Sequence, residues 1–358
     1  MLRPLRHAHR HLTASASKVK TNFVSLSKDK LNAKVLECGL PAFRAKQLMQ
    51  WVYGRRVSDF SAMHNLDAKT RKQFDDEFYI DVGSLRKCEV DPDGTRKWLV
   101  GWDEGQRAVE MVFIPKNARG TLCISSQAGC SLNCAFCATG AMSKDSLRNL
   151  SSGEIVSQYL LASSSLGVDH RVTNLVFMGM GEPLYNWRNV RGALQILRDH
   201  VGLASRSMTV STAGVAPLLE QVAAEGVRLA ISLHAVDDDM RDILVPLNKT
   251  YNISTLLDAC RRVAPRLSRR ITFEYVLLGG VNDGRDKAVK LAQLVEGIDC
   301  VVNLIPFNAW DGSVYRPPET SVGFAFQEEL LSRQVMCTIR LPRGRDIKAA
   351  CGQLGGDK

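Results

Sequence analysis

The chain has 358 residues, enough for a large barrel or two domains, and its 45% hydrophobic and 23% charged residues are typical of a globular enzyme. Ten cysteines in this length are too few for a disulfide scaffold, and no apolar run approaches the length of a membrane span. The net charge of +10 favours an anionic partner, nucleic acid first of all, although excess charge can also serve solubility.

Residues 1–22 are basic, and the first acidic residue of the chain is Asp29. This Arg-rich, Ser-containing composition is that of an organelle transit peptide, and equally that of a disordered arm that touches phosphates. The segment has no apolar core of the kind found in secretory signals. We interpret it as a disordered extension of a cytoplasmic protein, with organelle targeting as the alternative.

Residues 23–82 have a helical pattern, with Leu48, Trp51 and Val52 at helical spacing. Asp59 and Asp67 stand where short helices would begin, and aspartate is a common helix cap. We therefore expect a small helical accessory domain here.

Residues 83–118 alternate between apolar and polar side chains, as in 97–102 and 109–114. Asp93-Gly94 and Glu104-Gly105 separate the alternating runs, and such pairs favour tight turns. This pattern predicts antiparallel hairpins that connect the accessory domain to the remainder of the chain.

Residues 119–345 carry short apolar runs separated by amphipathic segments, a pattern typical of a parallel sheet covered by helices. Because six units are too few for a closed eight-stranded barrel, the fold class expected is α/β, as an open (βα)6 partial TIM barrel. The expected strands are Leu122–Ser125, Leu175–Met178, Met208–Ser211, Leu229–Leu233, Phe273–Leu278 and Val301–Ile305. The expected helices are Glu154–Leu166, Val190–Leu197, Val215–Ala224, Ile253–Val263 and Lys287–Val295.

Polar residues follow every expected strand except the fifth. In parallel barrels the chemistry lies at the carboxyl ends of the strands, so we expect these residues to share one face. They are a cysteine loop after the first strand, Gly179–Pro183 after the second, Ser211-Thr212, Ser232-Leu233-His234 and, after the sixth, Asn308.

The cysteine loop places Cys130, Cys134 and Cys137 in the spacing Cys-x3-Cys-x2-Cys, with Phe136 before the third thiol. A structural zinc takes four ligands, whereas a cubane iron–sulfur cluster held by three thiolates keeps one iron free for a ligand. The loop resembles that of the radical S-adenosylmethionine (SAM) superfamily, in which the open iron chelates the methionine end of SAM. Half of a zinc site, or three unrelated thiols, are the alternatives.

The segment Gly179-Met180-Gly181-Glu182-Pro183 allows close backbone approach to a ligand, because its glycines have no Cβ. The same resemblance assigns Gly181 and Glu182 to the amino group of SAM, while an ordinary strand-to-helix turn is the alternative. Further candidates for binding the ribose, carboxylate or adenine of SAM are Ser211, Ser232, Leu233, His234 and Asn308, although each polar one alone is more often a cap or a satisfied polar group.

Two isolated cysteines carry the functional prediction further. Cys123 lies on the strand that leads into the cysteine loop, and Cys351 lies in a C-terminal tail, residues 346–358. A buried structural thiol is the default interpretation of each. A cysteine followed by glycine in a tail is nevertheless poorly placed for core packing and well placed to reach into a site.

Together these motifs resemble the RlmN/Cfr family of radical SAM RNA methyltransferases, over about residues 25–354. The resemblance is carried by Cys130/Cys134/Cys137, Thr121–Gln127, Phe177–Pro183, Ser232–Ala235 and Ala349–Leu354. It implies a [4Fe-4S] cluster and two SAM molecules per turnover: the first methylates Cys351, and the second yields a 5′-deoxyadenosyl radical that takes hydrogen from the S-methyl group. The resulting methylene radical adds to an adenine carbon.

The resemblance also implies two further roles. Cys123 as thiolate attacks the Cys351 sulfur, which releases the RNA adduct and leaves a transient disulfide. Glu110 removes the ring proton, a role that depends on the resemblance alone. A radical route is needed because C2 of adenine is electrophilic and cannot attack the methyl group of SAM.

The substrates implied are an adenosine in the peptidyl transferase centre of 23S rRNA and the adenosine next to the anticodon in some tRNAs. The Gly-Glu-Pro motif and Pro306-Phe307-Asn308 favour C2 over C8 methylation, which stays as the alternative, although Arg340–Arg345 departs somewhat from the commonest C2 pattern. Basic clusters at Arg261-Arg262, Arg266, Arg269-Arg270, Arg343 and Arg345 could bind phosphates. A monomer, an external electron donor such as flavodoxin or ferredoxin, and no membrane contact are expected.

Two rival functions stay open. A radical SAM enzyme acting on a protein or metabolite would have no use for the Cys123/Cys351 pair. A zinc-binding RNA chaperone would not gather polar residues at the strand ends. The remaining cysteines have no assigned role and are expected to be buried thiols: Cys38, Cys88, Cys260, Cys300 and Cys337.

Overall fold

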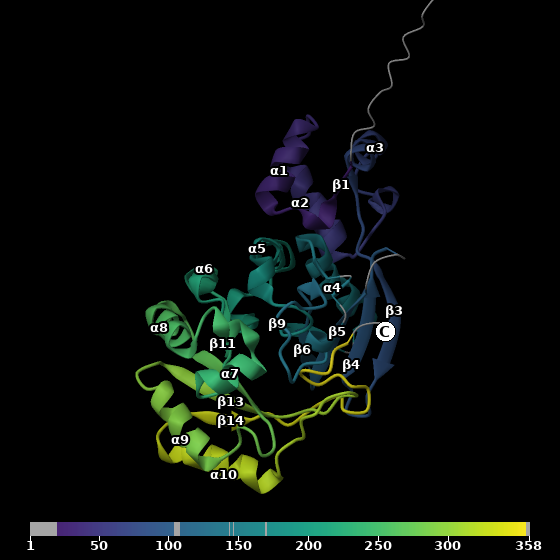
Figure 1. The fold of residues 1–358 in the computed structure, drawn as a ribbon. Coiled ribbons are helices and arrows are strands. Elements are labelled where there is room, and N and C mark those ends of the chain that lie inside the picture. The colour runs from purple at the N-terminus through teal and green to yellow at the C-terminus, as the bar shows by residue number, and fades with distance from the viewer. Residues whose placement is uncertain (1–19, 104–107, 143, 146, 169, 356–358) are drawn as a thin grey trace, which may run out of the picture.

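The computed structural model describes residues 20–103, 108–142, 144–145, 147–168 and 170–355, so most of the expected basic extension lies outside the described residues. Figure 1 shows a helical unit at one end, a curved sheet with helices on its outside, and a C-terminal segment that returns to the hairpin strands. None of the helices in the described ranges has the length and apolar character needed to cross a membrane.

The N-terminal unit is helical, as expected, and two short parallel strands close it. Its elements are β1 (Thr21–Asn22), α1 (Lys28–Glu37), α2 (Phe43–Met49), α3 (Ala68–Glu77) and β2 (Phe78–Tyr79). Asp67 caps α3 by accepting from the Thr70 amide at 2.8 Å, and Asp59 caps a 3-10 turn through the Ser61 amide at 2.8 Å. Both predicted caps are confirmed.

Aromatic side chains form the core of this unit. Phe74 is fully buried and packs against Phe78, with ring centroids 6.2 Å apart, and against Phe60 at 6.4 Å. Tyr53 extends the cluster toward the barrel, where its ring meets His200 edge to face at 5.0 Å. Tyr53 and His200 each lie in a π-helical turn, so the two units join where both helices are locally widened.

The rest of the chain is built on one ten-stranded sheet, in the order β14-β13-β12-β11-β10-β9-β6-β5-β4-β3. A separate antiparallel pair is formed by β7 (Gln127–Ala128) and β8 (Arg148–Asn149). Its antiparallel part comprises β3 (Ser84–Val90), β4 (Arg96–Gly101) and β5 (Val109–Lys116), which pairs with β6 (Arg119–Cys123). The parallel part runs from β6 through β9 (Arg171–Phe177), β10 (Met208–Thr212), β11 (Arg228–Ser232), β12 (Ile271–Leu277) and β13 (Cys300–Pro306) to β14 (Cys337–Ile339). The hairpins therefore continue the barrel sheet.

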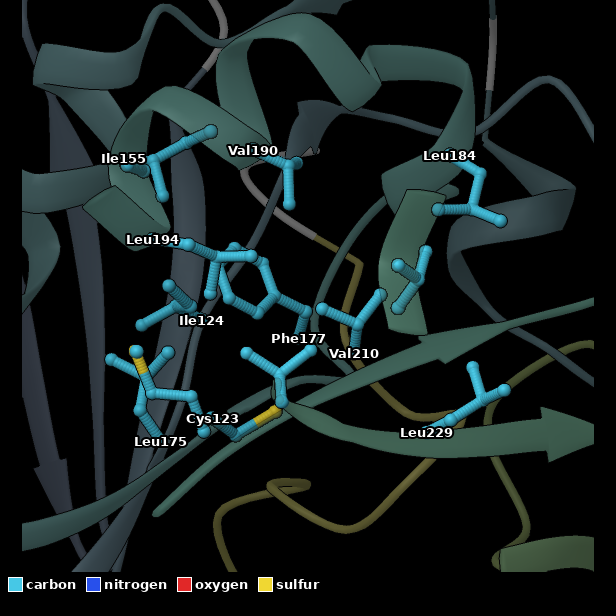
Figure 2. Close-up of a cluster of buried hydrophobic side chains, with 14 of the residues drawn as sticks. Cys123, Ile124, Ile155, Leu175, Phe177, Leu184, Val190, Leu194, Val210 and Leu229 are labelled. Atoms are coloured by element: carbon cyan, nitrogen blue, oxygen red, sulfur yellow. The ribbon is translucent and has the colours of Figure 1, made fainter. Parts of the chain in front are cut away.

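The six expected barrel strands are all present, and the open barrel is confirmed, but β14 adds a seventh parallel strand that the sequence pattern did not indicate. The helices are α4 (Ser152–Ser165), α5 (Trp187–Ile196), α6 (Leu219–Ala224), α7 (Asp238–Leu244), α8 (Ile253–Val263), α9 (Arg285–Leu294) and α10 (Thr320–Ser332). Of these, α7 and α10 were not expected. Figure 2 shows the core between the sheet and α4 and α5, where Cys123, Leu175, Phe177, Val190 and Leu194 meet.

Replacing Phe74 with alanine should destabilise the N-terminal unit by about 3–5 kcal/mol, because a fully buried ring is lost from the aromatic cluster. Hydrogen exchange of the peptides covering residues 21–79 measures this local free energy. Phe43→Ala is the matched control: its ring is 57% exposed, and the change should stay within about 0.5 kcal/mol. Equal effects of the two substitutions would contradict the packing described here.

Candidate active site

The cysteine loop follows β6 and is held against the barrel by its backbone. Ala135 donates to the carbonyl of Leu244, at the end of α7, at 3.1 Å. Gly140 packs so closely on the loop that a Cβ there would lie 2.9 Å from the carbonyl oxygen of Cys134. These contacts fix the loop at the carboxyl ends of the strands, where chemistry was expected.

A cavity opens beside the loop and encloses about 950 Å³ of empty space, counting its open mouth. The predicted site residues that line it are Cys130, Cys134, Cys137, Gly181, Glu182, Ser211, Ser232, His234 and Cys351. The structure thus brings together residues from five separate segments. Leu233 is fully buried and is not among the lining residues, and Asn308 lines a neighbouring cavity instead.

The three loop thiols are half-buried and close to one another. Burial raises the pKa of Cys130 to about 12, and burial with the charges of Cys137 and Cys130 raises the pKa of Cys134 well above its usual range. In the part of the chain that the structure describes, no three His, Cys, Asp or Glu side chains converge on one ion position. Each ligand of a cubane cluster binds a different iron, so three thiols spaced around a cavity mouth fit such a cluster.

Glu182 and Arg241 are two buried charges that meet at one residue of the cavity wall. The carboxylate of Glu182 accepts from the amides of Leu184 at 2.9 Å and Ala213 at 2.8 Å, and burial raises its pKa. Arg241 donates to the carbonyl of the same Ala213 at 2.6 Å and to that of Ser232 at 3.1 Å, and burial lowers its pKa to about 10. The pair therefore fixes the ends of β10 and β11 around the cavity.

His234 lies in the cavity wall with a left-handed backbone, φ 61°, and its ring meets Phe136 edge to face at 4.6 Å. Its Nδ1 accepts from the amide of Val276 at 3.1 Å. Burial, with a smaller contribution from Arg241, lowers its pKa to about 3, so the ring is neutral at physiological pH. In a neutral imidazole whose Nδ1 accepts, Nε2 carries the proton and is the available donor.

A second cavity adjoins the first, with about 540 Å³ of empty space counted in the same way. Cys123, Asn308 and Arg340 line only this second cavity, whereas Cys351 lines both. Cys351 therefore stands in the wall between the loop thiols on one side and Cys123 on the other.

The C-terminal tail is anchored to the site at Cys351 and just after it. Thr139 donates its hydroxyl to the carbonyl of Leu354 at 2.6 Å, and the Ala138 amide donates to the carbonyl of Gly352 at 2.8 Å. The Asn308 side chain donates to the carbonyl of Cys351 itself at 3.2 Å. Asn308 thus contacts the tail, not only the space expected to hold a cofactor.

Cys123 and Glu110 lie near the end of this tail. Cys123 is a buried free thiol, and burial together with the charge of Cys351 raises its pKa to about 12. Glu110 is buried on β5, where its carboxylate pairs with Lys97 at 3.3 Å and accepts from the amide of Gly355 at 2.7 Å. Because side chains alternate along a strand, Glu110 faces the same side as Val112, which lines the second cavity.

The unassigned cysteines are free thiols, but the expectation that all are buried is wrong. Cys260 and Cys337 are buried, Cys38 and Cys300 are half-buried, and Cys88 is exposed. Cys88 lies on β3, the edge strand of the sheet, where one face is open to solvent. Sequence reasoning also missed Arg241, which bonds residues of the first cavity's wall, and Arg340, which lines the second cavity. Arg241 was missed because it lies in an acidic, polar segment, and Arg340 because it follows the unexpected β14.

Two family models match the chain. One is described as the ribosomal RNA large subunit methyltransferase N-terminal domain and matches residues 21–80, and the other, the radical SAM superfamily, matches residues 124–292. The chain is 46% identical to the dual-specificity RNA methyltransferase RlmN of Rhodopseudomonas palustris strain BisB5, over 94% of this chain and 89% of that one. It is 43% identical to the protein of the same name from Rhodospirillum rubrum, over 99% of this chain and 85% of that one.

A solved structure is similar over nearly the whole fold. The radical SAM methyltransferase from Sphaerobacter thermophilus superposes with a TM-score of 0.88 at 38% identity. The match covers 93% of this chain and 99% of that one.

Acid should destabilise the protein through His234. Its pKa is about 3 in the fold and about 6.5 in the unfolded chain, so below about pH 6.5 the unfolded state binds a proton that the folded state does not. Stability is therefore lost as the pH falls, and His234 alone should remove about 1 kcal/mol between about pH 7 and pH 5.5. Urea unfolding at the two pH values should show a smaller loss for His234→Gln than for the wild type; equal losses would refute this.

Proposed function

The chain belongs to the RlmN family of dual-specificity RNA methyltransferases, and from this membership we infer that it methylates C2 of an adenosine in RNA. It is a radical SAM enzyme with a [4Fe-4S] cluster and two SAM molecules per turnover. The substrates we propose are the adenosine in the peptidyl transferase centre of 23S rRNA and the one next to the anticodon in some tRNAs.

The observation that carries the proposal is the position of Cys351 between two cavities. A sulfur that first accepts a methyl group and later gives up a carbon to RNA must meet two different partners. One cavity offers the three loop thiols and the other offers Cys123, and Cys351 borders both. An enzyme that only abstracted hydrogen from a small molecule would need neither the tail thiol nor a second thiol beyond it.

The cofactor site follows from the residues of the first cavity. Cys130, Cys134 and Cys137 would hold the cluster. The wall that would surround SAM comprises Gly181, Glu182, Ser211, Ser232 and His234, with Leu233 and Asn308 behind it. When bound in this cavity, the cluster and SAM would supply a methyl group and a radical able to abstract hydrogen.

The protein residues then divide the remaining work. Cys351 accepts the methyl group on sulfur and carries the carbon to the base. Cys123 attacks the Cys351 sulfur as a thiolate, forms a disulfide with it and frees the methylated RNA. Glu110 accepts the proton from the ring carbon, and Lys97, at 3.3 Å, stabilises its carboxylate before that transfer.

The same tail links the proposed base to the proposed acceptor. Gly355 donates its amide to Glu110 four residues after Cys351, so the tail that carries the sulfur also bonds the carboxylate. An adenine entering between them must displace this amide before Glu110 can reach a ring proton. Binding of the RNA and release of the Glu110 carboxylate from the Gly355 amide would then happen together.

RNA would approach the face on which the tail lies. Lys87, Lys97 and Lys348 line a third cavity beside Glu110, and each pairs with a carboxylate: Lys87 and Lys97 with Glu89, and Lys348 with Asp311. The basic cluster on α8 is likewise largely paired: Arg261 with Asp258 at 3.0 Å and Arg266 with Glu220 at 3.2 Å. Phosphates could exchange for these carboxylates on either surface, and the tail face is the one beside Glu110.

Three further assignments complete the proposal. The electron that starts the radical step would come from an external donor such as flavodoxin or ferredoxin. The protein would act as a monomer. It would work in the cytoplasm, where thiols stay reduced, in keeping with its ten free cysteines.

The site of methylation can be tested on the RNA itself. Purified enzyme, incubated anaerobically with SAM, a reductant and unmodified 23S rRNA or tRNA, should produce 2-methyladenosine on digestion to nucleosides, because both cavities serve carbon transfer to the base. Chromatography with mass spectrometry separates the isomers. Only 8-methyladenosine, or no methyladenosine, would overturn the C2 proposal.

The two thiols can be tested separately. Cys123→Ala should accumulate a covalent protein–RNA adduct through Cys351, since nothing remains to attack that sulfur. Denaturing gels and mass spectrometry of the linked peptide detect it. Cys351→Ala should give no adduct, and Cys88→Ala, which removes an exposed thiol, should turn over like the wild type. An adduct in the Cys351→Ala protein would contradict the proposed roles.

A further inference from the structure

Arg340 lies in the second cavity and has no part in the steps above. It directly follows β14, and its backbone amide donates to the carbonyl of Leu304 at 2.9 Å, which continues the pairing with β13. This fixes Arg340 at the carboxyl end of the last parallel strand. The residue is half-buried and lines the cavity together with Cys123 and Cys351.

The guanidinium of Arg340 has no hydrogen-bond or ion-pair partner among the described residues. Other arginines of the region are held: Arg343 donates to Asp93 at 2.7 Å, and Arg241 donates to several carbonyls. Arg340 is instead surrounded by groups that act on it through charge. Cys351 contributes most to raising the pKa of Arg340, followed by Glu274 and Cys123, against the opposing effect of burial.

We propose that Arg340 is a positioning residue that stabilises the Cys351 thiolate for methyl transfer, and the Cys123 thiolate after it. The proposal rests on the function proposed above. In the first step Cys351 loses its proton to solvent, and a lone pair of its sulfur forms a bond to the methyl carbon. The bond from that carbon to the sulfonium sulfur breaks, and its electron pair stays on the departing thioether. A guanidinium beside the thiolate compensates the negative charge before this displacement.

The other charged groups around Cys351 favour this assignment. On the second cavity, Arg343 is neutralised by Asp93. Glu274, on the first cavity, accepts from the side chain of Asn303 at 2.6 Å. On the first cavity the titratable groups are His234, which is neutral, and three kinds of acidic group: Glu182, Glu274 and the loop thiols. Among the described residues that line the two cavities, Arg340 is therefore the cation without an ion-pair partner, and its charge can act on the sulfurs of Cys123 and Cys351.

The test is the rate at which iodoacetamide alkylates Cys351 as a function of pH, in the full-length enzyme with its cluster. Peptide mass mapping separates free, alkylated and methylated Cys351, and Cys88 in the same digest is the internal control. In Arg340→Gln, alkylation of Cys351 at about pH 7 should fall about tenfold, because the cation that stabilises its thiolate is gone. Arg340→Lys should restore part of the effect, because it retains the charge.

Arg343→Gln is the matched control, since Arg343 lines the same cavity but is held by Asp93; its Cys351 profile should match the wild type. An unchanged Cys351 profile in Arg340→Gln, with normal circular dichroism and iron content, would overturn the proposal. If Arg340→Gln does not fold, the alkylation profile of Cys351 in Arg340→Lys is used in its place. A wild-type alkylation profile in Arg340→Lys, combined with reduced methylation of Cys351, would also overturn the proposal. Failure to methylate RNA would leave this alkylation profile unaffected, so the two proposals fail separately.

Discussion

The hydrogen bonds between the cysteine loop and the C-terminal tail are the constraint on which the site depends. Thr139 and Ala138 follow directly after Cys137, and they bond Leu354 and Gly352, which lie three residues and one residue after Cys351. The segment that carries three thiols thus also positions the fourth, although more than 200 residues separate them. Each such bond contributes about 1 kcal/mol, so the tail is ordered without being permanently fixed.

Two opposite buried charges keep the rest of the cavity in shape. A buried carboxylate or guanidinium alone would be costly, but Glu182 and Arg241 bond the two sides of the Ala213 backbone. Each group is thus satisfied by backbone hydrogen bonds while it fixes the strand ends. Neither group needs to touch a ligand to matter for the site, because the positions of Ser211 and Ser232 depend on the same strand ends.

The sequence predicted the barrel well where apolar runs and polar strand ends coincide. Each of the six expected strands has a buried core residue, and all but the fifth are followed by a predicted site residue, as in Phe177 followed by Gly181 and Glu182. Strand β14 escaped because Cys337–Ile339 is three residues long, too short for a pattern. The short helix α7 was not predicted because most of its residues are polar, and a polar composition does not indicate that one of them, Arg241, is buried. Cys88 was wrongly predicted to be buried, because composition does not show which strand lies at the edge of a sheet.

What no pattern could show is which of two neighbouring spaces a residue faces. That Asn308 meets the tail, and that Arg340 lies beside two thiols, depends on how the last strand and the tail fold back across the barrel mouth. The sequence separation of these partners is long, so no local spacing records it.

The shared wall of the two cavities has a consequence for the speed of the enzyme. Because Cys351 borders both spaces while its carbonyl and the flanking backbone stay bonded, its sulfur could pass from one space to the other by a side-chain rotation without a rearrangement of the backbone. Rotations of exposed side chains take place in picoseconds to nanoseconds, faster than loop motions of the backbone. Shuttling of the sulfur would then add almost nothing to the time of a catalytic cycle.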